Sequence, residues 1–298
     1  MSQDTMKYEI RNNQIAIAVE QHGAELKSLV RTGDNTELLW KGDPKYWGGQ
    51  SPVLFPTVGN CYEASIRHQG KTYPMPQHGL VRNMDFALSQ QTDDSLSLVV
   101  ESNGHTLSHY PFPFRLTVNY RLQDNRLYVS FHVTNTGREA MPFLLGAHPG
   151  FQLPGFQAQD EIHGYLGFDV KGKLTSLGLK PGGFVWREGS FEVGLDDNNM
   201  LALTNTTFLC DTILDDFTRP RTCTLYNKGK NPVVTVRFDS PVLALWAPCG
   251  GCAPFVCIEP WWGLCDEYEY RGEYGERPFA NKVNVGETQT ISYSIEVH

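Results

Sequence analysis

Two short stretches of the sequence place a proton-transfer group at the end of an apolar run and directly before proline. In LLGAHPGF, residues 144 to 151, this group is the imidazole of His148. In APFVCIEPWWG, residues 253 to 263, it is the carboxyl group of Glu259. Either residue alone is most simply read as a hydrogen-bonded structural residue. Together, an imidazole and a carboxyl group can serve as a general acid and a general base.

The residues around Glu259 favour a strand end beside a cleft. Pro260 biases the residue before it toward extended geometry and removes one main-chain donor from a sheet. Alternation along a strand would place Phe255, Cys257 and Glu259 on one face. The apolar residues of the run should partly desolvate the carboxylate, and desolvation raises the pKa of a carboxyl group. Glu259 is therefore expected to be a stronger base than an exposed glutamate.

Four segments together resemble a known family. They are SPVLFPTVGN (51 to 60), MPQHGLVRNMDF (75 to 86), LLGAHPGF and CIEPWWG (257 to 263). Their order and spacing resemble the aldose 1-epimerase (galactose mutarotase) family, most closely its LacX-type branch, which typically shows PvLFP.vG, HGFaR, HPaF and EPW.G. The resemblance runs from residue 22 to the closing strands. Leu80 and Val81 depart from the HGFaR pattern, which changes the pocket lining more than the chemistry.

The resemblance implies an enzyme that interconverts the α and β anomers of an aldose without a cofactor, on a galactose mutarotase-like supersandwich. Opening a cyclic hemiacetal requires one proton delivered to the ring oxygen and one removed from the C1 hydroxyl. By the family match, His148 is the acid and Glu259 the base. We expect the two groups to face one another across a cavity about as wide as a pyranose ring.

The same resemblance implies four substrate-binding residues. His78, in QHGLVR, matches the family's second histidine and would hydrogen-bond the ring oxygen or a neighbouring hydroxyl. Arg82 would contact a hydroxyl or a phosphate, because its planar fork suits bidentate contacts. Asp211 would accept hydrogen bonds from sugar hydroxyls. Trp246 would line the pocket and stack on the sugar ring.

Several other functions stay open on the sequence. One is the same chemistry on hexose 6-phosphates, which needs a cationic pocket that only Arg67, Lys71 and Arg82 could supply nearby. Another is a carbohydrate-binding protein without catalysis. A metal site of two histidines and Glu259 is disfavoured by the ligand spacing. A glycosidase is disfavoured because it needs two flanking carboxylates. We therefore expect no metal and a free aldohexose as the substrate.

The elements that position these residues are expected to be strands. The apolar residues of FRLTVNYRLQ (114 to 123) and RLYVSFHVTN (126 to 135) alternate with polar ones, which predicts an antiparallel hairpin. VVTVRFDS and QTISYSIEVH predict further strands, and 28 glycines and 18 prolines suit many tight turns. No amphipathic helix of ten residues is evident. The expected fold is all-β, a large antiparallel β-sandwich forming one domain over residues 1–298.

The amino-acid composition limits the kinds of molecule that this protein is expected to bind. A net charge of −8 argues against nucleic acid or an anionic membrane and leaves small sugars open. Without a signal-like segment or a long apolar run, the expected location is the cytoplasm. The seven cysteines are then read as reduced thiols, with CGGC (249 to 252) as a glycine-rich turn instead of a zinc or redox motif. The sequence does not decide between a monomer and a homodimer.

Overall fold

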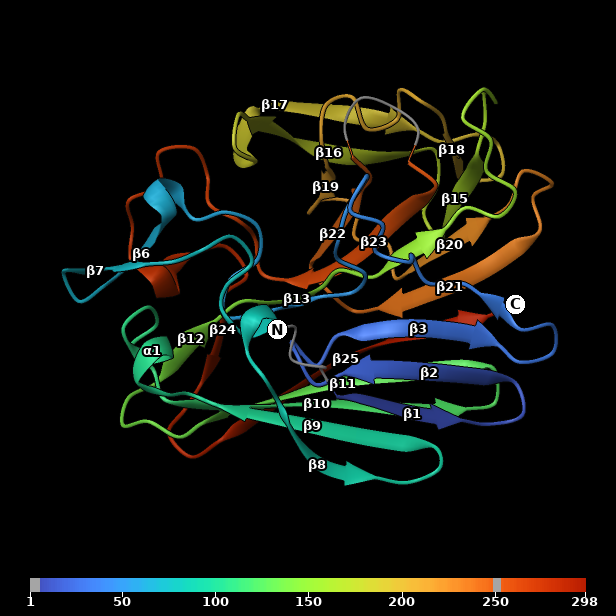
Figure 1. Cartoon of the computed structure of the whole chain (residues 1–298). Coiled ribbons are helices and arrows are strands. Elements are labelled where there is room, and N and C mark those ends of the chain that lie inside the picture. The colour runs from blue at the N-terminus through green and yellow to red at the C-terminus, as the bar shows by residue number, and fades with distance from the viewer. Residues whose placement is uncertain (1–5, 249–252) are drawn as a thin grey trace.

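A computed structural model of the chain describes residues 6–248 and 253–298, and antiparallel strands make up almost all of its regular structure (Figure 1). The largest sheet has nine strands. In spatial order they are β18 (Met200–Leu203), β15 (Gly164–Phe168), β20 (Thr222–Tyr226), β21 (Pro232–Phe238), β25 (Thr288–Val297), β11 (Arg126–Asn135), β10 (Phe114–Gln123), β9 (Ser95–Glu101) and β8 (Ala87–Gln91).

Two smaller sheets accompany it. The first contains β1 (Lys7–Arg11), β2 (Ile15–Glu20), β3 (Leu26–Arg31) and β4 (Thr36–Glu37). The second has six strands, β19 (Ile213–Asp215), β22 (Val242–Trp246), β23 (Phe255–Trp262), β13 (Leu145–Ala147), β5 (Val53–Leu54) and, also paired with β23, β14 (Gly150–Gln152). Three two-stranded ribbons complete the strands: β6 (Ser65–His68) with β7 (Lys71–Pro74), β12 (Met141–Phe143) with β24 (Asn281–Val283), and β16 (Lys173–Lys180) with β17 (Phe184–Gly194).

The predicted hairpin is confirmed as β10 and β11, which pair from Phe114 with Asn135 to Gln123 with Arg126. Its alternating apolar side chains are buried along both strands. Each fully buried side chain of this kind contributes about 1.5–3 kcal/mol relative to exposure. The predicted strands at VVTVRFDS and QTISYSIEVH are β21 and β25, which pair with each other. The register is fixed because a shift by one residue would expose the apolar face.

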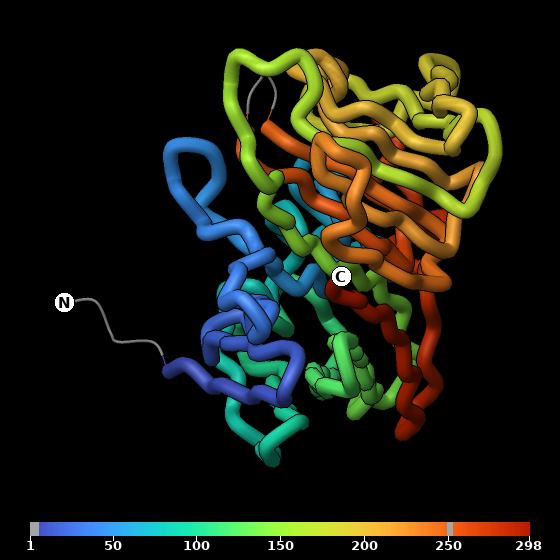
Figure 2. Tube along the Cα trace, turned by 90° about the vertical axis from the view of Figure 1, so that its right-hand side faces the viewer, coloured from blue at the N-terminus to red at the C-terminus, as the bar shows by residue number. Residues whose placement is uncertain are grey.

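The four-stranded sheet packs against the nine-stranded one. Strands β1 to β3 run alongside β9, β10 and β11 (Figure 1), and the hydroxyl of Tyr120 on β10 donates to the carbonyl of Ala24 at 2.7 Å. Apolar residues of both sheets belong to one buried core. Figure 2 shows the blue and teal part of the chain at one end of the molecule and the yellow and orange part at the other. The antiparallel sandwich expected from the sequence is therefore present.

Helices are few and short. Within the described residues, the α-helix is a single turn, α1 (Gly104–Leu107), and the 3-10 turns are η1 (Tyr62–Ala64), η2 (Val81–Asn83) and η3 (Tyr274–Glu276). In this part of the chain, no helix combines the length and apolar character that a bilayer span requires. His105 lies in α1, where Asn103 caps the turn by accepting from the N–H of Thr106. The CGGC segment falls outside the described residues.

Candidate functional site

His148 and Glu259 are cross-strand neighbours. Strands β13 and β14 pair with β23 in one continuous register, in which Gly146 lies opposite Trp261. Because the strands are antiparallel, moving two residues forward from Gly146 and two residues back from Trp261 brings His148 opposite Glu259 in the same register. His148 lies in the short gap between β13 and β14, where proline follows it, and its position is fixed by the sheet on either side. Residues directly opposite in an antiparallel pair hold their side chains on the same face.

The two side chains touch. Nε2 of His148 lies 3.3 Å from Oε2 of Glu259, and the indole N–H of Trp261 donates to the same oxygen at 3.2 Å. Glu259 is 1% exposed and His148 is 7% exposed. The expectation that the groups face one another across a cavity as wide as a sugar ring is therefore wrong. They lie side by side on one wall, because adjacent strands carry them in register.

Burial shifts the two groups in opposite directions. It raises the pKa of the Glu259 carboxyl group well above its ordinary value, with Asp211 adding to the rise and the Trp261 hydrogen bond opposing it. It lowers the pKa of His148 well below its ordinary value, and the neighbouring His78 and Arg82 lower it further. The raised carboxyl pKa agrees with the expectation from the apolar sequence around it. Burial thus shifts the proton affinities of the imidazole and the carboxylate toward each other.

His78 is held by its main chain in an uncommon conformation. Its φ is +63°, a left-handed value that non-glycine residues rarely adopt and that often marks functional sites. Its N–H donates to the carbonyl of Gly59 at 2.8 Å, and the N–H of Gly59 donates to its Nδ1 at 3.1 Å. Nδ1 is thus the acceptor, and the neutral ring carries its proton on Nε2. Burial, with Arg82 nearby, lowers the pKa of His78 to about 3.

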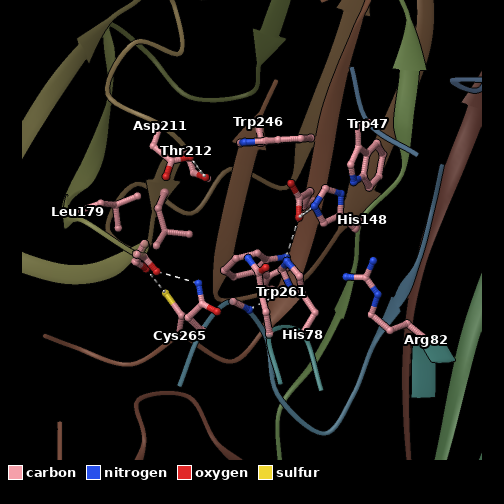
Figure 3. A pocket seen from close by; sticks show the side chains of 17 residues that line it. Trp47, His78, Arg82, His148, Leu179, Asp211, Thr212, Trp246, Trp261 and Cys265 are labelled. Carbon is pink, nitrogen blue, oxygen red and sulfur yellow. Dashed lines mark hydrogen bonds and ion pairs between the residues drawn. The ribbon is translucent and has the colours of Figure 1, made fainter. Parts of the chain in front are cut away.

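These residues line one cavity of about 380 Å³ (Figure 3). All six residues singled out from the sequence contribute to it: His78, Arg82, His148, Asp211, Trp246 and Glu259. Cavities of this size are typical of small-ligand sites. The structure therefore brings the predicted residues together from five separate parts of the chain.

Charges are distributed unevenly around the cavity. Arg82, on η2, and Asp211, in the turn before β19, lie on opposite sides of it (Figure 3). Among the described residues Arg82 has no carboxylate within ion-pair distance, and it is the single Lys or Arg of the lining. Arg67 instead pairs with Glu63 at 2.7 Å, and Lys71 lies on the exposed β7. Neither one lines the cavity.

Other lining residues were not predicted from the sequence to be site residues. They are Trp47, Gly59, Asn60, Gln77, Leu179, Gly182, Gly183, Thr212, Leu214, Trp261 and Cys265. Gly59, Asn60, Gln77 and Trp261 fall inside the motif segments, and their place in these segments was the signal that could have identified them. Trp47 belongs to a turn-rich segment without periodicity, so no pattern pointed to it. Its ring stacks on His148, with centroids 4.7 Å apart and planes at 26°.

One group of side chains could hold a metal ion. The ligand atoms of His148, Cys257 and Glu259 lie within 4.8 Å of one another, and all three residues are buried. This differs from the set considered from the sequence, because Cys257 takes the place of His78, whose Nδ1 is already hydrogen-bonded to Gly59. Burial raises the pKa of the Cys257 thiol well above its ordinary value, which disfavours the thiolate that metals prefer.

The chain is similar to known proteins in sequence and in fold. The sequence profile of the aldose 1-epimerase family matches residues 6–268. The chain is 29% identical over 300 residues to the chromosomal LacX protein of Lactococcus lactis subsp. lactis, covering 98% of this chain and 99% of that protein. A galactose mutarotase related enzyme from Lactobacillus acidophilus superposes with a TM-score of 0.90 at 30% identity, covering 98% and 97% of the two chains.

A galactose mutarotase-like protein from Lactobacillus casei is equally similar, with a TM-score of 0.90 and 30% identity over 98% of this chain and all of the other. The fold is thus that of the galactose mutarotase-like proteins. The family profile covers most of the chain, including the four motif segments and the cavity they form. This chain belongs to the aldose 1-epimerase family.

Proposed function

We propose that this protein interconverts the α and β anomers of a free aldohexose by general acid–base opening and closing of the sugar ring. His148 gives a proton to the ring oxygen while Glu259 takes one from the C1 hydroxyl. The C1–O5 bond breaks and leaves an open-chain aldehyde. After rotation about C1–C2, the C5 hydroxyl adds to the other face of the carbonyl with the two proton transfers reversed.

The contact between His148 and Glu259 inside a sugar-sized cavity is the observation that carries this proposal. The two oxygens that exchange protons are both bonded to C1, so acid and base must act close together. A separation of 3.3 Å between Nε2 and Oε2 suits such a pair better than groups on opposite walls. Burial raises the pKa of Glu259 and lowers that of His148, which shifts the proton affinities of the two groups toward each other, as suits a pair that must transfer protons in both directions.

The remaining predicted residues fit binding roles in this scheme. His78 would donate from Nε2 to the ring oxygen or a neighbouring hydroxyl, and its low pKa keeps it neutral. Asp211 would accept hydrogen bonds from hydroxyls at the far side of the cavity. Trp246, half-buried at the end of β22, would offer a flat apolar face to the sugar ring. Arg82 would donate to a hydroxyl.

The charge of the cavity favours free sugars over sugar phosphates. A phosphate carries up to two negative charges and is usually bound by several cations or clustered main-chain donors. Here Arg82 is the single lining cation in the described part of the chain, and the carboxyl groups of Asp211 and Glu259 share the cavity. A phosphate would gain one cationic partner and meet two acidic groups.

Anomeric exchange rates test the proposal directly. We expect the wild type to accelerate mutarotation of α-glucose and α-galactose in polarimetry, with a much weaker effect on glucose 6-phosphate. His148→Asn and Glu259→Gln should each lower kcat about 10²- to 10⁴-fold, the contribution usual for a positioned acid or base. His132→Asn, on a half-buried histidine of β11, is the matched control and should retain full activity.

Three outcomes would contradict the proposal. Rates near the wild type in both variants would remove His148 and Glu259 from the chemistry. Faster exchange of glucose 6-phosphate than of glucose would select the phosphate-specific reaction. Sugar binding detected by calorimetry without any exchange by saturation-transfer NMR would select a carbohydrate-binding protein.

A further inference from the structure

We propose that Trp47 is a positioning residue that fixes the plane of the His148 imidazole through ring stacking. The inference rests on the proposed function, since it explains how the histidine assigned as the acid is oriented. Trp47 comes from the turn-rich segment between β4 and β5, far in sequence from His148. Figure 3 shows the two rings next to each other at one side of the cavity.

Within the described residues, Nδ1 of His148 is without the hydrogen bond to a second residue that usually orients such a ring. Histidines that move protons or bind metals usually have their second ring nitrogen bonded to a carboxylate, a carbonyl or a water, and that bond orients the ring. In the part of the chain that the structure describes, Nδ1 of His148 is buried and has no hydrogen-bond partner on another residue. The orientation of the ring must therefore come from packing and from the contact with Glu259.

Three rings surround the imidazole. Trp47 covers one face, with centroids 4.7 Å apart and an interplanar angle of 26°. Trp246 and His78 meet it at steep angles of 77° and 82°, with centroids 5.7 and 5.4 Å away. Rotation about the Cβ–Cγ bond would drive the imidazole edge into the indole face of Trp47. One stacked face and two steep contacts thus hold the ring in one plane.

Trp47 is itself firmly placed. Its main-chain N–H donates to the carbonyl of Asp43 at 3.0 Å, and its main-chain carbonyl accepts from the indole N–H of Trp40 at 2.8 Å. Trp40 stacks on Phe255 with centroids 4.4 Å apart, and Trp47 lies over the same phenylalanine at 5.8 Å and 19°. Phe255 begins β23, the strand that carries Glu259. Trp47 thus packs against both the His148 ring and β23, so the plane of the imidazole is fixed relative to the strand that carries Glu259.

Two glycines make room for the indole. A Cβ atom on Gly49 would lie 2.6 Å from the Trp47 ring, too close for any side chain. A Cβ on Gly150, just after His148 and Pro149, would come within 3.3 Å of the same ring. The backbone on both sides is thus shaped to the indole.

Steady-state kinetics separate positioning from substrate contact. Trp47→Phe keeps a flat ring and should hold kcat within about threefold of the wild type. Trp47→Ala frees the imidazole and should lower kcat by about 10- to 100-fold with KM within twofold, because small misplacements of a catalytic group are costly. Trp246→Ala is the contrast: the stacked face of Trp47 on His148 stays in place, and the loss of a sugar-stacking face should mainly raise KM.

NMR titration of the His148 ring gives a readout that does not depend on activity. The titratable and charged groups facing His148 are Glu259 and Cys257 from β23, with His78 and Arg82 from the 75–86 segment. All four are unchanged in the Trp47 variants. We expect water to reach the ring in Trp47→Ala and the pKa of His148 to rise toward its ordinary value, with Trp47→Phe close to the wild type.

The kinetics and the titration test the positioning role of Trp47 separately from the proposed anomeric exchange. If Trp47→Ala raises KM at constant kcat, or leaves the His148 titration unchanged, the positioning role is overturned. If the wild type shows no anomeric exchange, the proposed function fails, while the titration still decides whether Trp47 controls His148. Should Trp47→Ala not fold in a thermal melt, Trp47→Leu takes its place, because leucine keeps volume without a flat face. Trp186→Ala, on an exposed tryptophan of β17, controls for loss of an indole.

Discussion

Gly59 and His78 hold each other through two reciprocal hydrogen bonds, one between main-chain groups and one from the Gly59 N–H to Nδ1 of the imidazole. The second bond fixes the tautomer, so the proton on Nε2 is available as a donor at the cavity. The low pKa of His78, about 3, follows from burial of the same ring. The buried, hydrogen-bonded position of His78 thus determines both its tautomer and its low pKa.

His78 should make stability fall in acid. Between about pH 6.5 and pH 3 the unfolded chain binds a proton at His78 that the native protein does not, so the free energy of unfolding falls as pH falls, by up to about 1.4 kcal/mol per pH unit. The buried His148 acts in the same direction and Glu259, whose pKa is raised, in the opposite one. His78→Asn removes the His78 contribution alone.

The measurement is urea unfolding of the wild type and His78→Asn at pH 7.5, 6.0 and 5.0. Asparagine tolerates positive φ and can accept from Gly59, so the variant keeps the local geometry. We expect the stability curves of the two proteins to diverge below pH 6.5, with the variant less sensitive to acid. Parallel curves would show that His78 is protonated in the native state.

His78→Asn should also impair anomeric exchange at neutral pH. The variant loses the Nε2 donor while the Gly59 hydrogen bond is retained, and removing one such donor at a developing charge typically lowers kcat about 10²- to 10³-fold. Polarimetry with glucose and galactose measures the effect. Activity within threefold of the wild type would exclude His78 from the reaction.

Gly59→Ala should disturb both stability and activity. The position has φ +59°, and an added Cβ would lie 2.4 Å from Cβ of Cys265. Gly70→Ala is the matched control, because φ is +74° there and nothing lies within 4 Å. The control should cost about 1 kcal/mol from backbone strain. Gly59→Ala should cost about 1–3 kcal/mol more, from overpacking. Equal losses in urea unfolding would contradict the close packing around Gly59.

Arg277 and Asp266 form a buried bidentate ion pair whose loss should be severe. Nε and Nη2 of Arg277 donate to the two carboxylate oxygens at 2.6 and 2.9 Å, and the N–H of Tyr62 donates to one of them at 2.8 Å. Arg277→Met leaves a buried carboxylate without its cation and should cost about 3–5 kcal/mol. Calorimetric melts and urea unfolding measure this loss.

The control for the ion pair is Arg237→Met. Arg237 pairs with Glu296 at 3.1 Å at a half-exposed position, and such pairs contribute about 0–1 kcal/mol. The double variant Asp266→Asn with Arg277→Met should recover much of the loss, because no unpaired charge remains. A single-variant loss below that of Arg237→Met would show that water reaches Asp266.

Sequence reasoning succeeded where a regular pattern carries the information. The β10–β11 hairpin follows from strict alternation over ten residues on each strand. The relation of His148 to Glu259 could not be predicted in the same way, since β13 and β14 are three residues long and their pairing is decided by tertiary contacts. The resemblance supplied the residues but not their separation, which is why a facing arrangement was expected.

The lining residues from turns were missed for a different reason. Trp47 and Thr212 lie in irregular segments whose course depends on what they pack against. The Trp47 indole is located by Trp40 and Phe255, one from the same segment and one from β23. No local rule relates residue 47 to residue 255. Such contacts emerge only when the whole sandwich is assembled.

The shared register of β13, β14 and β23 has an evolutionary consequence. His148 and Glu259, the proposed proton-transfer pair, are spaced by main-chain pairing of a buried sheet, whereas much of the cavity rim is built from turns such as those around Gly182 and Asp211. Substitutions or insertions in those turns can therefore reshape which sugar is admitted and leave the reactive centre intact.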